Sequence, residues 1–142
     1  MEGIVAVTTI AGKKAKTINP EHIPNATYCH PEIGSVGLTE AKAEEAGYNL
    51  KVGKFPFTAN SRASIVGQHE GFIKIVSDTD YGEILGVHII GPQATELIAE
   101  AVAAIELEAT VEDLIWTIHA HPTLAEAMLD ASNSVYGMAI NA

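Results

Sequence analysis

The residues best suited to chemistry lie in one short stretch, H-A-H-P-T-L-A-E at positions 119–126. An imidazole whose Nδ1 is held by a carboxylate keeps one tautomer, and its Nε2 is then free to take a proton. His121 and Glu126 can form such a dyad if the chain bends between them. Because a residue before proline avoids the helical region, we expect His121 in a turn before a helix over 123–132. Glu126 would then lie one turn inside that helix.

Spacing alone leaves two other interpretations of this stretch open. Thr123 and Glu126 have the T-x-x-E spacing of a capping box, in which the carboxylate only bonds back to the amide of the cap. His119, His121 and Glu126 could instead be zinc ligands, but a zinc site needs a further ligand that the stretch does not supply. The other four histidines are scattered without ligand spacing, so we expect no metal.

Composition narrows the class of protein. Of 142 residues, 47% are hydrophobic and 18% are charged, so the chain can bury a core and is not disordered. Eight basic and 18 acidic residues give a net charge of −10, and residues 75–142 hold 11 acids without one Lys or Arg. Such a surface repels phosphates, so we expect neither nucleic acid nor an anionic membrane as a partner. No apolar run reaches the roughly 18 residues that span a bilayer.

The single cysteine, Cys29, excludes an internal disulfide, a C-x-x-C redox pair and a four-cysteine zinc site. We expect it to be a buried, inert thiol in a short strand. Dinucleotide-binding, P-loop and nucleophile-elbow glycine patterns are missing from the sequence. The acidic start M-E-G is unlike a signal peptide, so we expect a soluble protein of a reducing compartment. The expected location is the bacterial cytoplasm, with the mitochondrial matrix as second choice.

Strands followed by helices are expected to position the stretch. Residues 2–10 are rich in β-branched types and locally favour a strand, which Gly12 and the following lysines end, and residues 19–24 are expected to form a linker. Short strands are expected at 26–29 and 33–37, and then a helix over 40–46 between a Thr39 cap and Gly47. Alternation predicts a strand over 50–56, and 61–66 is expected to continue as another strand.

The second half begins with the clearest pattern in the chain. Runs at 72–76 and 84–90, joined by the turn 78–82, predict a β-hairpin. Helices are expected over 94–107 and, with Thr110 as cap, over 111–118. An apolar stripe on the first of these helices comprises Leu97, Ile98, Val102 and Ile105. The elements predict an α+β fold, an antiparallel sheet of three to five strands packed with about three to four helices.

Several segments, in this order, resemble one family. They are A-G-K-K at 11–14, Y-C-H-P-E-I-G-S-V-G-L-T-E at 28–40, K-F-P-F-T-A-N-S-R-A at 54–63, L-G-V-H-I-I-G-P at 85–92 and H-A-H-P-T-L-A-E-A at 119–127. Together they resemble the C-terminal interface domain of dihydrolipoamide dehydrogenases, which are flavin disulfide oxidoreductases. The H-P-x-x-x-x-V-G-x-T-E element is shared with glutathione reductases, whereas F-P-F-x-A-N-S-R-A is typical of the lipoamide enzymes.

The resemblance covers essentially the whole chain but only one domain of that family. The FAD domain, its C-x-x-x-x-C disulfide and the NAD domain have no counterpart here. Residues 1–20 would be the tail of a FAD domain and a linker, which implies helix or disorder rather than the locally favoured strand. Residues 21–142 would be the dimerisation domain.

The resemblance also implies a function. His121 would be the general base and Glu126 its partner, acting across a homodimer on the disulfide and flavin of the other subunit, with His121 and Pro122 against that flavin. A cis peptide bond is expected between these two residues. The dimer interface would include Leu97, Ile98, Val102 and Ile105.

Cofactors and partners follow from the same resemblance. FAD and NAD would belong to the full-length enzyme, with none held by this chain alone. The partner would be the lipoyl domain of a 2-oxoacid dehydrogenase or glycine cleavage complex. The alternatives are a non-catalytic homodimerisation module and the interface domain of a related, glutathione reductase-like enzyme.

Overall fold

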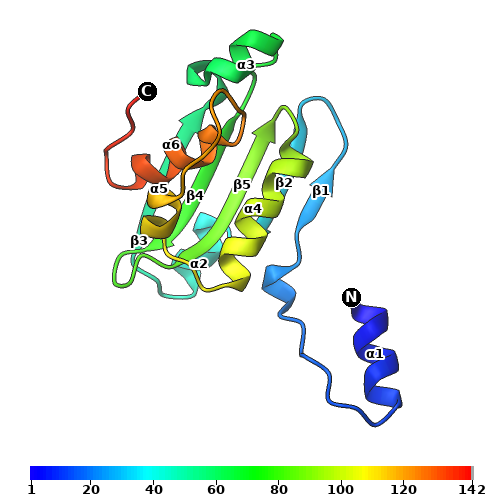
Figure 1. Ribbon diagram of the computed structural model, residues 1–142. Helices are drawn as coiled ribbons and strands as arrows, with labels where there is room; N and C mark the ends of the chain where they lie inside the picture. The colour runs from blue at the N-terminus through cyan, green and yellow to red at the C-terminus, as the bar shows by residue number, and fades with distance from the viewer. Residues whose placement is uncertain (142) are drawn as a thin grey trace.

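One antiparallel sheet organises the chain, which a computed structural model describes for residues 1–141 (Figure 1). Its strands are β1 (Asn25–Thr27), β2 (Glu32–Gly37), β3 (Leu50–Pro56), β4 (Phe72–Asp78) and β5 (Ile84–Gly91). They lie in the order β1-β2-β5-β4-β3, and every neighbouring pair is antiparallel. The predicted hairpin of β4 and β5 is confirmed, with Phe72 opposite Ile90.

The α-helices are α1 (Glu2–Ile10), α2 (Glu40–Glu45), α3 (Ser61–Val66), α4 (Ala94–Glu106), α5 (Val111–Trp116) and α6 (Glu126–Val135). Single 3₁₀ turns occur at Pro20–His22 and Phe57–Ala59. Helices α4, α5 and α6 lie together on one face of the sheet (Figure 1). The α+β class and the antiparallel sheet are confirmed, but residues 1–141 contain six α-helices because two segments predicted as strands are helical.

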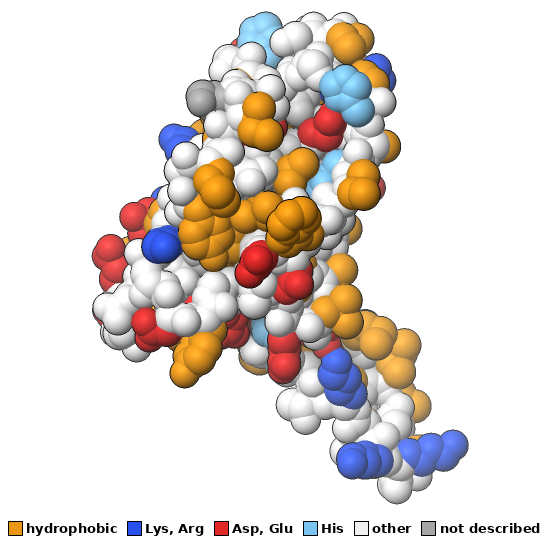
Figure 2. Space-filling model, turned by 60° about the vertical axis from the view of Figure 1, so that its left-hand side comes forward, with side chains coloured by type: hydrophobic (Ala, Val, Ile, Leu, Met, Phe, Trp, Pro, Cys, Tyr) orange, Lys and Arg blue, Asp and Glu red, His pale blue; other side chains and the backbone are white. Residues whose placement is uncertain are grey.

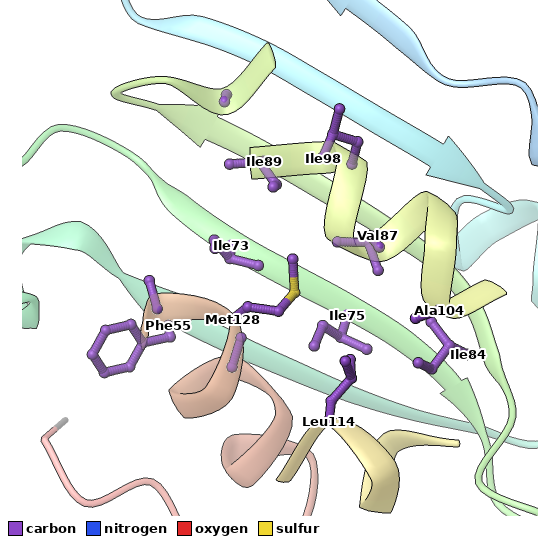
Figure 3. Packing of buried hydrophobic residues seen from close by; sticks show 14 of the residues in the cluster. Phe55, Ile73, Ile75, Ile84, Val87, Ile89, Ile98, Ala104, Leu114 and Met128 are labelled. Carbon is purple, nitrogen blue, oxygen red and sulfur yellow. The ribbon is translucent and has the colours of Figure 1, made fainter. Parts of the chain in front are cut away.

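The main core lies between the sheet and α4–α6, as Figure 3 shows. Alternate residues of β4 and β5 turn their side chains toward the helices, which return apolar side chains of their own. The labelled contributors include Ile73, Ile75, Val87 and Ile89 from the strands and Ile98, Leu114 and Met128 from the helices. On the opposite face, α2 packs Ala43 against Val76 in a smaller cluster.

Two predicted helix starts are confirmed. The Thr39 hydroxyl accepts from the Lys42 amide at the start of α2. At α5 the Thr110 hydroxyl accepts from the Asp113 amide, and the Asp113 carboxylate accepts from the Thr110 amide. Each contact satisfies an amide that the helix leaves without a carbonyl partner.

Two strand predictions are wrong. Residues 2–10 form α1, which agrees with the family resemblance rather than with local propensity. Residues 61–66 form α3, because the Asn60 side chain accepts from the Ala63 amide and Gly67 ends the helix in the left-handed conformation. A cap at each end outweighs the weak strand preference of the residues between them.

Helix α6 begins at Glu126, not at position 123, so the prediction that Glu126 lies one turn inside a helix is also wrong. The Asn60 side chain donates to the Thr123 carbonyl, and the Ala127 amide donates to Leu124 instead. Residues 123–125 therefore form a turn that leads into the helix.

None of the helices described in residues 1–141 is long and apolar enough to cross a membrane.

Helix α6 approaches β3 most closely at Gly53. A β-carbon there would lie 2.2 Å from the Ala131 carbonyl oxygen, and that atom belongs to backbone that cannot rotate away. We predict that Gly53→Ala lowers the free energy of unfolding by about 1–3 kcal/mol, as overpacking does. Gly3→Ala is the matched control, since nothing lies within 4 Å of its added methyl. Urea unfolding measures both, and equal stability of the two variants would contradict this packing.

Candidate functional site

The ring of His121 and the carboxylate of Glu126 are in contact, which is the geometry that the dyad interpretation requires. The His121 Nδ1 lies 2.9 Å from Glu126 Oε1. The imidazole is 73% exposed, whereas the Glu126 side chain is only 21% exposed. A carboxylate accepts, so Nδ1 must carry the proton and donate it. The Nε2 atom has no hydrogen-bond partner within residues 1–141 and opens to the outside.

The carboxylate of Glu126 serves two partners at once. Its Oε2 accepts from the Thr123 amide at 2.8 Å, while Oε1 accepts from His121. Half of the predicted capping box is thus present. The other half is not, because the Thr123 hydroxyl donates to the Ala120 carbonyl at 2.7 Å instead of accepting from the backbone amide of Glu126. The capping contact and the dyad therefore coexist, one on each oxygen.

Opposing influences act on the pKa of Glu126. Burial, the largest single influence, raises it, but the hydrogen bonds from Thr123 and His121 and the nearby histidine charges lower it more. The net result is a pKa below the ordinary value of a glutamate, so the carboxylate is ionised at neutral pH. An ionised Glu126 can stabilise an imidazolium at His121.

A small cavity lies beside the turn that carries His121. The peptide bond between His121 and Pro122 is cis, as expected. Besides the dyad, the cavity of about 160 Å³ is lined by Asn60, Ser61, Asp130 and Asn141. Asn60 was missed as a supporting residue, although its place before S-R-A and a glycine is a recognisable helix-cap pattern.

His119 does not join the dyad. Its side chain is only 7% exposed and its Nε2 lies 2.7 Å from Glu100 Oε1, on helix α4. Within residues 1–141 no group of three or more His, Cys, Asp or Glu side chains is placed to hold a metal ion. The zinc interpretation therefore has no support in the geometry.

The expectation for Cys29 is wrong. The thiol is exposed, and Cys29 lies in a bend beyond the end of β1. Its Sγ lies 2.9 Å from the Pro31 carbonyl oxygen. The peptide bond between His30 and Pro31 is cis. The strand predicted over 26–29 stops at Thr27, and β1 is itself exposed along its length at the edge of the sheet, so it offers no buried face to the thiol.

The apolar stripe proposed as a dimer interface divides into two pairs. Ile98 and Ile105 are buried in the core of this chain, so they have almost no surface to offer a partner. Leu97 and Val102 are half-buried at its edge. Val102 also lines a hollow with Ile4 of α1. Because α4 packs against two strands, half of its apolar residues face inward.

Chemically, this arrangement can take up and release a proton at an exposed Nε2. It cannot carry out disulfide exchange alone, because the sequence has one cysteine and a redox disulfide needs two.

The shared carboxylate predicts a pH dependence. A lowered pKa means that Glu126 contributes stability above its ordinary value of 4.5 and loses that contribution as pH falls through its folded pKa. The Tm difference between the parent chain and Glu126→Gln should be largest at neutral pH and shrink in acid. Glu45→Gln, an exposed acid on α2, should show a small difference at every pH. Thermal unfolding followed by circular dichroism measures this, and a pH-independent difference for Glu126→Gln would contradict it.

Comparison with known proteins identifies the family of the chain. The family described as pyridine nucleotide-disulphide oxidoreductase, dimerisation domain, matches residues 23–132. The dihydrolipoyl dehydrogenase of Thermus scotoductus is 50% identical over 140 residues, which are 99% of this chain and 30% of that protein. The enzyme of the same name from Bacillus subtilis is 47% identical over 140 residues, with the same two shares. The chain thus spans about 30% of the length of these relatives.

Solved structures give the same picture. The crystal structure of LpdA from Mycobacterium tuberculosis superposes with a TM-score of 0.86 at 25% identity, covering 94% of this chain and 29% of that one. The HOCl-induced flavoprotein disulfide reductase RclA from Escherichia coli shares the fold, with a TM-score of 0.84 at 21% identity over 92% of this chain and 30% of that one. The chain belongs to the pyridine nucleotide-disulphide oxidoreductase dimerisation domains.

Proposed function

We propose that this domain supplies the general base of a dihydrolipoyl dehydrogenase, with His121 as the base and Glu126 as its partner. One observation carries the proposal: His121 donates Nδ1–H to an ionised carboxylate and keeps an exposed Nε2 without a partner within residues 1–141. The relatives named dihydrolipoyl dehydrogenase that match 99% of the chain support the choice of reaction.

The proposed step is proton removal from a dihydrolipoamide thiol. Such thiols are mostly protonated near neutral pH, and only the thiolate attacks a disulfide. The S–H bond breaks, its proton moves to the His121 Nε2, and the thiolate keeps the electron pair. Glu126 stabilises the imidazolium that results. This support matters because α6 begins at Glu126, and the positive end of a helix nearby disfavours a positive ring.

The rest of the reaction needs parts that lie outside this chain. When bound, FAD and NAD would carry the electrons away from the redox disulfide. His121 and Pro122, at the exposed end of the dyad, are the residues that would face the flavin of a partner subunit.

We propose a homodimer as the setting, with a lipoyl domain as the carrier of the substrate. Figure 2 shows hydrophobic side chains gathered across the middle of one face, with acidic side chains directly beside them. Large exposed apolar residues lie at the end of α5, just after it and near the C-terminus, among them Trp116, Ile118 and Ile140. Exposed apolar surface of this kind is typical of an interface.

Turnover in the full-length enzyme tests the dyad. His121→Ala should lower kcat with dihydrolipoamide by about 10²–10⁴-fold, since a positioned base is lost, and should leave flavin content unchanged. Glu126→Ala should cost less and should shift the acidic limb of the pH–rate profile.

The order of these effects can contradict the proposal in two ways. If Glu126→Ala only lowers stability while His121→Ala is severe, Glu126 is a cap and not a partner of the base. If both variants keep near-normal kcat, His121 is not the base.

Sedimentation or light scattering tests the dimer. We predict that the 142-residue chain forms a symmetric dimer that tightens as salt rises, because salt screens the repulsion between two chains of charge −10. Trp116→Ala should weaken the dimer, and Tyr81→Ala, an equally exposed aromatic in the β4–β5 turn, should not. A monomer at high protein concentration in both low and high salt would refute the prediction.

A further inference from the structure

We infer that Glu100 and His119 form a positioning pair. The pair holds the loop between α5 and α6, which carries His121, against helix α4. His119 is the first histidine of the H-A-H-P motif, and its ring bonds to Glu100 and Thr117 rather than to a member of the dyad. The inference rests on the proposed function in one respect, since the group that the pair positions is the proposed base, His121.

Every polar atom of the His119 ring is bonded. Its Nε2 lies 2.7 Å from Glu100 Oε1, and its Nδ1 lies 3.0 Å from the Thr117 carbonyl oxygen. A carboxylate only accepts hydrogen bonds, so the ring is the donor toward Glu100. A hydrogen bond to a carboxylate is charge-assisted and stronger than one between two neutral groups.

The pair is placed where it can fix the position of His121. The His119 side chain is 7% exposed and Glu100 is 29% exposed, so the bond lies largely out of water. Helix α4 is itself anchored on β2 and β5. A single residue, Ala120, separates this anchor from His121. Movement at His119 must therefore move the base.

A short series of hydrogen bonds continues from the anchor to the carboxylate. The Ala120 carbonyl accepts from the Thr123 hydroxyl, and the Thr123 amide donates to Glu126 Oε2. The loop between α5 and α6 is thus held at one end by His119 and at the other by Glu126. Releasing either end changes the distance between His121 Nδ1 and Glu126 Oε1, on which the dyad depends.

The chain contains a second pair of the same chemistry, which serves as a control. The His22 Nδ1 lies 2.8 Å from Glu106 Oε2, and Glu106 is the last residue of the same helix α4. That pair fastens the segment after α1 rather than the loop of the dyad. Loss of His22 therefore removes a histidine–carboxylate bond to α4 without touching the site.

The test compares His119→Phe with His22→Phe. In the 142-residue chain, hydrogen exchange of the Thr123 amide reports the loop directly, because that amide donates to Glu126. We expect exchange at least about tenfold faster in His119→Phe, with core strand amides unchanged, and no change in His22→Phe. In the full-length enzyme, kcat should fall about tenfold or more with KM for NAD unaffected, since a misplaced base slows chemistry alone.

A second pair of variants separates geometry from mere loss of packing. Glu100→Ala should reproduce both effects, whereas Glu100→Gln keeps an acceptor oxygen for Nε2 and should recover most of the protection and of kcat. If His119→Phe matches His22→Phe in Thr123 exchange and in kcat, the inference is wrong. It is equally wrong if kcat is unchanged in His119→Phe while His121→Ala is inactive. Near-normal turnover in His121→Ala would instead reject the proposed function, and the exchange data would still decide whether the pair holds the loop.

Discussion

The site depends on one carboxylate that is shared between two donors. Glu126 gives one oxygen to the His121 ring and the other to the Thr123 amide. This arrangement satisfies an amide at the start of α6 and also fixes the tautomer of the imidazole. Because the side chain is mostly buried, it would be costly to leave either oxygen without a donor. The structural and the chemical requirement thus act on the same atoms and favour the same geometry.

The surrounding fold holds the ends of that arrangement in place. Helix α6, which begins with Glu126, packs closely against β3 at Gly53. The Asn60 side chain ties the turn to the start of α3, and Glu100 ties the preceding segment to α4. A flexible connection is therefore fixed from three rigid elements. Such support is what a base needs if its Nε2 is to stay in one position.

Much of this could be predicted from the sequence where a pattern is regular. Alternation predicted the strands over 50–56 and 72–76, and a mostly apolar run predicted the hairpin partner over 84–90. The helices after Thr39 and Thr110 were predicted from their capping residues. The spacing of His121 and Glu126 allowed a dyad but also a capping box, and the family resemblance favoured the dyad.

The failures have physical causes that local patterns do not contain. Residues 2–10 and 61–66 contain β-branched types, but α3 is decided by its two caps and α1 has no strand beside it within residues 1–141. The start of α6 depends on Asn60, which lies more than 60 positions away. The stripe on α4 could not be divided by periodicity, because a helix packed on a sheet shows the same period whether its apolar residues face inward or outward.

The tautomer of His121 tests the central claim most directly. Long-range ¹H–¹⁵N spectra of the ring, recorded on the 142-residue chain in the neutral form of the imidazole, distinguish a proton on Nδ1 from one on Nε2. The shared carboxylate predicts the proton on Nδ1, with Nε2 bare, and a change toward the ordinary mixture in Glu126→Gln. A proton on Nε2 in the parent chain, unaffected by Glu126→Gln, would show that the carboxylate does not hold the ring and would contradict the account.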